Sequence, residues 1–273
     1  MSALRLSLAP ILALALLCLS AGAAVGREQP TTDARGGDSR SLTGYDISYP
    51  QCGARYPTDV AFGIVGVNGG RVYSENPCLG AGGNGASQLA WAGLNAELYM
   101  NTGNPGPELS SYWPVGQASP RVCSADDPDT ADCAYDYGWN AAADAYAVAV
   151  RAYISLGWAS PDAERTPVAN RWWLDVETAN SWRSDASLNV AALQGMVDFL
   201  ESMEVESVGF YSVDGMWDSI TGGTDAFADR ASWVAGASTL RGARANCDRE
   251  PFTGGWVELT QYFAKGFDAN HRC

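Results

Sequence analysis

Short apolar segments alternate with helical segments along most of this chain, and that alternation limits the folds open to it. The clearest strand is 62–67, which reads Phe-Gly-Ile-Val-Gly-Val, and the clearest helix is 139–156, where apolar residues recur at helical spacing. Strands that alternate with helices predict a mostly parallel α/β sheet. The other expected strands are 45–48, 96–101, 171–177, 207–212, 232–237, 257–262 and 266–268, and the other expected helices are 86–95, 189–203 and 214–220.

About eight strands in one domain favour a closed sheet over an open one. We therefore expect an α/β fold, an irregular TIM-like (β/α) barrel in which the later helices are shortened or missing. An open doubly wound sheet is the alternative. No linker rich in Pro, Gly or Ser interrupts 41–273, so we expect this range to form a single barrel domain.

The N-terminal segment has the three parts of a secretory signal peptide. A basic start with Arg5 precedes an apolar run at 9–19, and small residues suited to cleavage end the segment at 24. The apolar run is shorter than the roughly 20 residues that a membrane span needs, so an uncleaved anchor is the weaker reading. We expect an exported protein with no membrane contact after cleavage, and a polar, flexible leader at 25–40.

Cysteine usage independently supports export. Six of the seven cysteines remain after signal cleavage, and an even number in an exported chain implies disulfides. Six cysteines allow 15 connectivities, among which proximity along the chain favours pairing neighbours. A zinc site is the rival interpretation, but the chain has no C-x-x-C pair and one histidine, so we expect no metal. The favoured pairs are Cys52 with Cys78, Cys123 with Cys133, and Cys247 with Cys273.

The charge balance restricts the class of partner. The formal net charge is −14, and an acidic protein lacks the basic patches that bind nucleic acid.

The segment 80–85 formally fits G-x-G-x-x-G, but it follows Pro77-Cys78 and no clear strand, so we expect no dinucleotide and no other organic cofactor.

Paired carboxylates lie at the end of the strand expected at 171–177. Asp175 and Glu177 are two residues apart, so their side chains project from the same face of a strand. The C-terminal strand ends of a parallel barrel form its active face. Two adjacent carboxylates repel, which raises the pKa of one so that it can donate a proton, as glycoside hydrolysis requires. The alternative interpretation is a surface acid pair at a helix N-terminus.

Two further acids lie in the first and last expected strands. Asp46 lies in the first and Asp268 in the last, and these strands are neighbours in a closed barrel. The two acids are therefore expected to flank the central pair. Trp182 and Trp217 each follow a predicted strand end, which makes them candidates for stacking on sugar.

These motifs together resemble the glycoside hydrolase family 25 lysozymes, and more closely a related family of exported bacterial glycoside-hydrolase-like domains of uncertain activity. The resemblance spans 44–273 in order, although 62–70 ends in Asn-Gly-Gly where a typical lysozyme has a Lys-Ala-Thr-Glu-Gly-like segment. It is carried by Asp46-x-Ser48, Asp175-x-Glu177, Gln261-Tyr262 and Asp268-x-Asn270.

The resemblance implies cleavage of a β-1,4 bond next to N-acetylmuramic acid. Glu177 would be the general acid/base, and Asp175 would orient or stabilise an intermediate formed by the substrate's acetamido group. Asp46 and Asp268 would shape the charge of the site. The side chains implied to contact sugar are Tyr211, Trp233 and Gln261.

We therefore expect a secreted, monomeric glycosidase that acts on peptidoglycan or a related N-acetylhexosamine polymer. A non-catalytic glycan-binding or cell-wall-associated module on the same barrel is the second hypothesis. Burial of the carboxyl groups against arginine would favour that module. An exported structural or inhibitor-like protein that uses its loops as an interface is the third.

Overall fold

The computed structural model describes residues 43–83, 85–158 and 170–273. The expected signal peptide and leader lie outside these residues. Within them, no helix is both long enough and apolar enough to cross a membrane.

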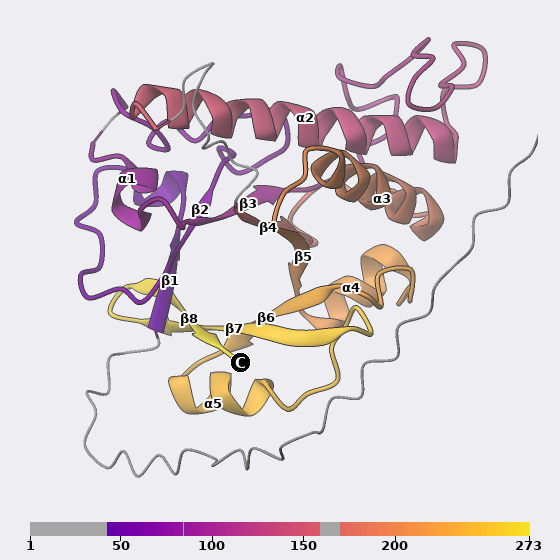
Figure 1. Cartoon of the computed structure of the whole chain (residues 1–273). Coiled ribbons are helices and arrows are strands. Elements are labelled where there is room, and N and C mark those ends of the chain that lie inside the picture. Colours follow the sequence, from indigo (N-terminus) through magenta and orange to yellow (C-terminus); the bar gives the residue numbers. More distant parts are fainter. Residues whose placement is uncertain (1–42, 84, 159–169) are drawn as a thin grey trace, which may run out of the picture. The chain divides into compact units, whose positions relative to one another are not determined.

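The predicted closed barrel is confirmed (Figure 1). Neighbouring strands pair in sequence order from β1 to β7, always in parallel, and β8 pairs antiparallel with both β7 and β1. The strands are β1 (Thr43–Ile47), β2 (Gly63–Gly66), β3 (Glu97–Asn101), β4 (Arg171–Asp175), β5 (Ser207–Ser212), β6 (Ala231–Ala237), β7 (Trp256–Ala264) and β8 (Phe267–Arg272).

The antiparallel direction of β8 follows from the turn before it. Lys265 and Gly266 are the only residues between β7 and β8, and both have positive φ, at 53° and 85°. Two such residues form the tight hairpin turn whose twist matches that of paired strands. The hairpin returns β8 alongside β1, where Asp268 lies opposite Asp46 in the strand register.

Helices cover the outside of the barrel in the described parts of the chain. They are α1 (Gln88–Ala92), α2 (Ala131–Ser155), α3 (Ala186–Ser202), α4 (Asp214–Thr221) and α5 (Leu240–Asn246), with a short 3-10 helix at Tyr49–Gln51. Helix α2 begins two turns earlier than its apolar spacing indicates, because Thr130 caps its first turn through a hydrogen bond from the Cys133 amide. Helix α5 was not predicted, since seven residues are too few to show a helical period.

Two apolar cores lie on either side of the strands. Ile64, Trp173 and Leu259 are fully buried among the residues that fill the barrel interior. Leu174 and Val176 belong to the larger core, which also contains apolar residues of α2, α3 and α4. The alternation predicted along β4 is therefore present, with Leu174 and Val176 packed against the helices and Asp175 directed to the opposite face.

Helices α2 and α3 lie side by side and pack closely (Figure 1). A Cβ at Gly138 of α2 would overlap the carbonyl oxygen of Ala192 in α3, and a Cβ at Gly195 would overlap the carbonyl oxygen of Tyr135. The backbones of α2 and α3 are therefore in direct contact at both glycines.

The three disulfides favoured by spacing are present, with Cα–Cα distances of 5.7, 4.6 and 5.5 Å. They join Cys52 to Cys78, Cys123 to Cys133, and Cys247 to Cys273. The second holds the long loop before α2 against the first turn of that helix, and the third joins the end of α5 to the residue after β8.

Candidate active site

A cavity of about 220 Å³ opens at the C-terminal ends of the parallel strands. It brings together the four acids singled out in the sequence and three of the five predicted sugar contacts, Tyr211, Trp233 and Gln261. The eighth lining residue, Tyr99, was not predicted. The lining residues are Asp46, Tyr99, Asp175, Glu177, Tyr211, Trp233, Gln261 and Asp268.

The ends of β4 and the loop after it hold the central pair of acids. Asp175 is the last residue of β4, and the Thr102 hydroxyl donates a hydrogen bond of 2.5 Å to its carbonyl oxygen. The strand-like path continues for one residue, because the Val176 amide donates to the Tyr211 carbonyl. Glu177 follows, half-buried, and its carbonyl oxygen accepts a hydrogen bond from the Trp182 indole. Both carboxyl groups therefore face the same cavity.

The Asp175 carboxyl group is fixed on one oxygen and unpaired on the other. The Asn101 side-chain amide donates to Oδ2 over 2.6 Å, and the Asn68 side-chain oxygen accepts from the Asn101 backbone amide. Oδ1 is buried and has no hydrogen-bond partner among the residues described by the structure. Leaving a buried oxygen unpaired is costly, so Oδ1 is a favourable position for a further hydrogen-bond donor.

Asp46 is held by a network that crosses the barrel. The amides of Asn270 and Gln261 both donate to its Oδ2, over 2.7 and 3.1 Å. Gln261 accepts from the Tyr211 hydroxyl, and Asn270 accepts from the Trp233 indole. The donors on Tyr211 and Trp233 thus fix which way each amide faces. Asp46 receives two hydrogen bonds as a result.

Gly66 at the end of β2 makes room for Tyr99. A Cβ there would lie 2.6 Å from the Tyr99 ring and 2.7 Å from the Ser48 Cβ. Any larger residue would push the Tyr99 ring out of its place in the cavity wall.

The four carboxyl groups have raised pKa values, with burial as the largest cause in each case. Burial and then the charge of Asp268 raise the pKa of Asp46 to about 7. Burial and then Glu177 raise the pKa of Asp175 well above its ordinary value. Burial and then Asp268 raise the pKa of Glu177, and burial raises the pKa of Asp268 itself. None of the four forms an ion pair with a lysine or arginine in the described ranges, so their repulsion is not offset there. Burial and mutual repulsion therefore oppose simultaneous ionisation of all four groups.

Asp46→Asn is expected to flatten the dependence of stability on pH. Because the folded-state pKa of Asp46 is about 7, above its ordinary value of 3.8, the native state binds more protons than the unfolded state between these values. Stability must then fall as pH rises through that window. The asparagine keeps an acceptor for Asn270 and Gln261 and cannot ionise, so we expect it to be more stable than wild type by a few kcal/mol at pH 8. Urea unfolding of both proteins from pH 4 to 9 measures this, and equal slopes would contradict it.

Two tryptophans predicted to line the sugar groove lie elsewhere. Trp217 is wrong as a groove residue, because its side chain is fully buried among Phe210, Phe227 and Phe252. It lies on the inner face of α4, which packs onto the barrel. Trp182 is half-buried, does not line the cavity, and instead supports Glu177 through its indole.

Three residues that shape the site were missed as site residues in the sequence. Tyr99 and Asn101 share one face of β3, and Asn101 lies opposite Asp175 in the strand register. The available signal was a pair of polar side chains two residues apart at the C-terminal end of a buried strand. Asn68, one residue beyond the end of the predicted strand 62–67, had no comparable signal.

Comparison with known proteins finds the same fold in solved bacterial lysozyme and autolysin structures. A family model described as lysozyme-like protein 1 matches residues 162–249. The bacterial lysozyme from Streptomyces coelicolor is 16% identical with a TM-score of 0.50, over 86% of this chain and 93% of that one. The modular autolysin LytC from Streptococcus pneumoniae, in complex with synthetic peptidoglycan ligand, is 13% identical with a TM-score of 0.51, over 84% of this chain and 46% of that one.

A comparison with curated proteins finds no match. The two solved structures show that this chain has the lysozyme barrel fold. The resemblance to the lysozyme-like superfamily predicted from the motifs is confirmed.

Proposed function

We propose that this protein is an exported glycoside hydrolase that cleaves peptidoglycan, or a related N-acetylhexosamine polymer, next to N-acetylmuramic acid. The observation that carries the proposal is the cavity at the C-terminal strand ends, where four carboxyl groups converge without a counter-cation among the described residues. A protein that only binds glycan has no need to maintain such repulsion. In a hydrolase it supplies both a proton donor and a negative charge beside a cationic transition state.

Glu177 is the proposed general acid/base. Its carboxyl group is half-buried at the cavity wall, and its raised pKa favours the protonated form that a general acid needs. It transfers that proton to the oxygen of the leaving sugar as the glycosidic bond breaks. The carboxylate that remains then takes a proton from the attacking water.

Asp175 is the proposed partner of the substrate's acetamido group. Its Oδ2 is fixed by Asn101, while the unpaired Oδ1 provides an acceptor for the N–H of that group. A hydrogen bond there would orient the acetamido oxygen toward the anomeric carbon and stabilise the positive charge that develops. Asp46 and Asp268 add negative charge to the same cavity. Tyr211, Trp233 and Gln261 contact the sugar.

Other observations agree with this proposal. The autolysin with the same fold was solved with a synthetic peptidoglycan ligand, which makes a similar polymer the first substrate to test. Three disulfides suit an oxidising compartment outside the cytosol. We further propose that 1–24 is a cleaved signal peptide, 25–40 a leader and 41–273 the catalytic domain.

The test is digestion of purified cell walls by the wild-type protein, followed by mass spectrometry of the soluble products. We expect loss of turbidity and new reducing ends at N-acetylmuramic acid. Products with new reducing ends only at N-acetylglucosamine would refute the proposed bond. Wall binding without any product would instead support the non-catalytic module.

A further inference from the structure

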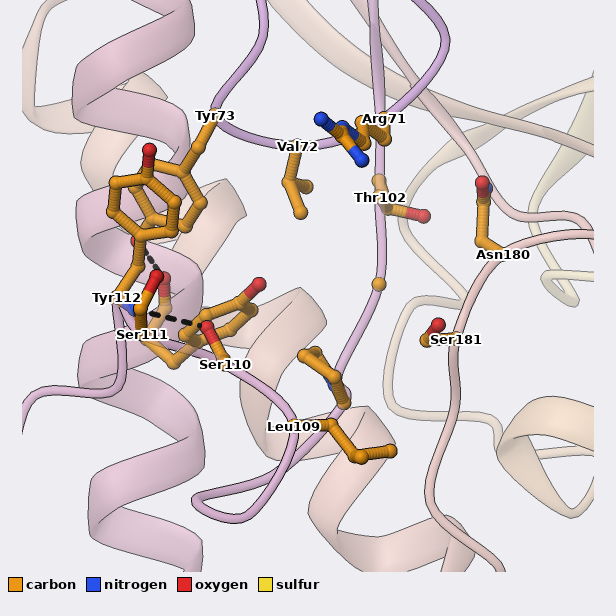
Figure 2. Close-up of a pocket in the computed structure, with 13 residues that line it drawn as sticks. Arg71, Val72, Tyr73, Thr102, Leu109, Ser110, Ser111, Tyr112, Asn180 and Ser181 are labelled. Atoms are coloured by element: carbon orange, nitrogen blue, oxygen red, sulfur yellow. Dashed lines mark hydrogen bonds between the residues drawn. The ribbon is translucent and has the colours of Figure 1, made fainter.

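The structure has a second cavity, of about 460 Å³ (Figure 2). The loops that follow β2, β3 and β4 build it together with Tyr137 of α2, and the loop after β3 is the long one that leads into α2. The cavity therefore opens on the same end of the barrel as the four acids. Figure 2 shows Tyr73, Tyr112, Ser110 and Ser111 along one wall, with Asn180 and Ser181 along the opposite wall.

Two residues that line the second cavity form hydrogen bonds with the backbone of residues that line the first. Thr102 lines the second cavity, and its hydroxyl donates to the carbonyl oxygen of Asp175. Asn180 also lines it, and its backbone amide donates to the carbonyl oxygen of Glu177 over 3.1 Å. A polymer bound at the acids would therefore pass directly next to this second cavity.

The second cavity carries the opposite charge. Arg71 lines it with an exposed guanidinium group that has no acidic partner among the described residues, whereas the nearby Glu75 pairs with Arg151. The side-chain amide nitrogen of Asn180 is buried there without an acceptor in that same part of the chain. An unpaired guanidinium and an unpaired amide donor together form a site for a carboxylate or a peptide carbonyl.

Aromatic and apolar surface completes the site. The rings of Tyr73 and Tyr112 stack at 4.1 Å between centroids, and 55% of Tyr112 remains exposed. Leu109 is 79% exposed on the same loop, which the Cys123–Cys133 disulfide holds in place. Large exposed apolar side chains beside fixed polar groups are typical of a surface that binds a partner.

We propose that this second cavity binds the peptide that branches from N-acetylmuramic acid, with Arg71 pairing with a peptide carboxylate. The proposal rests on the proposed function, because such a peptide is attached to the sugar next to the bond cleaved at the acids. It makes the protein selective for peptide-bearing strands over bare glycan.

The test measures binding by calorimetry in a Glu177→Gln background, which prevents cleavage. The probes are two tetrasaccharides of alternating N-acetylglucosamine and N-acetylmuramic acid, one bearing pentapeptides and one with free lactyl groups. We expect the peptide-bearing probe to bind about tenfold more tightly, the gain of one charge-assisted hydrogen bond. Adding Arg71→Gln should reduce this preference to about twofold or less.

Arg241→Gln is the matched control, since it removes an exposed charge from α5, which contributes nothing to the second cavity. It should keep the tenfold preference. Equal affinity for both probes, or a preference that survives Arg71→Gln, would overturn the peptide site and leave hydrolysis untouched. If neither probe binds, both the peptide site and the proposed substrate class are wrong.

Discussion

Glu177→Gln should reduce kcat on cell-wall glycan by about 10³-fold, since an amide cannot supply the proton that the leaving sugar needs. The substitution keeps the size of the side chain, so binding of the substrate should change little. Burial and Asp268 both raise the pKa of Glu177, which means that the charged carboxylate is costly in the folded protein. The melting temperature of the variant should therefore match or exceed that of wild type at neutral pH.

A lower kcat together with an unchanged or higher melting temperature separates a catalytic role of Glu177 from a structural one. Glu250→Gln makes the same chemical change at an exposed position and should keep full activity. The measurement is the initial rate of reducing-end release, with thermal unfolding of all three proteins. A Glu177→Gln protein that keeps more than half of the wild-type kcat would remove Glu177 from the role of general acid.

Gly138→Ala is expected to destabilise the protein by about 3 kcal/mol, near the upper end for overpacked sites. The added Cβ would overlap the Ala192 carbonyl oxygen and lie 2.7 Å from its carbonyl carbon. Both atoms belong to the α3 backbone, so no side chain can rotate away and the two helices must separate. The apolar residues between the helices and the barrel would lose contact in consequence.

Gly215→Ala provides the control for this prediction. Gly215 lies in α4, and a Cβ there would meet nothing within 4 Å. Alanine has the better helix propensity, so this variant should gain up to about 1 kcal/mol. Urea unfolding of both variants isolates the steric effect. A Gly138→Ala protein as stable as Gly215→Ala would show that α2 and α3 can separate at this contact at little cost.

The barrel could be predicted from the sequence because its signals are local. Most strands contain a short apolar run, and the two-residue spacing of Asp175 and Glu177 is enough to direct both to one face. The neighbouring positions of Asp46 and Asp268 required one further assumption, closure of the barrel, which the strand register bears out. The direction of β8 depended on the turn at Lys265-Gly266 and was not foreseen.

The errors and omissions concern side chains whose roles depend on three-dimensional neighbours. Trp217 follows a strand end, as a groove residue would. It lies on the inner face of the short helix α4, however, so its side chain is buried in the core. Asn101 is distinguished only by its strand register opposite Asp175. The second cavity draws on three separate loops, and no local pattern indicates that Arg71 and Asn180 both line it.

The candidate site can form only after β8 has paired with β1 and β7. Asp46 is anchored by Asn270, which is synthesised 224 residues later. Strands β1 to β7 can pair as they emerge, but the carboxyl cluster stays incomplete until residues 267–272 arrive. Such distant contacts form slowly, because a long loop must close before they stabilise anything. The proposed cleavage of glycan would therefore begin only after β8 has docked.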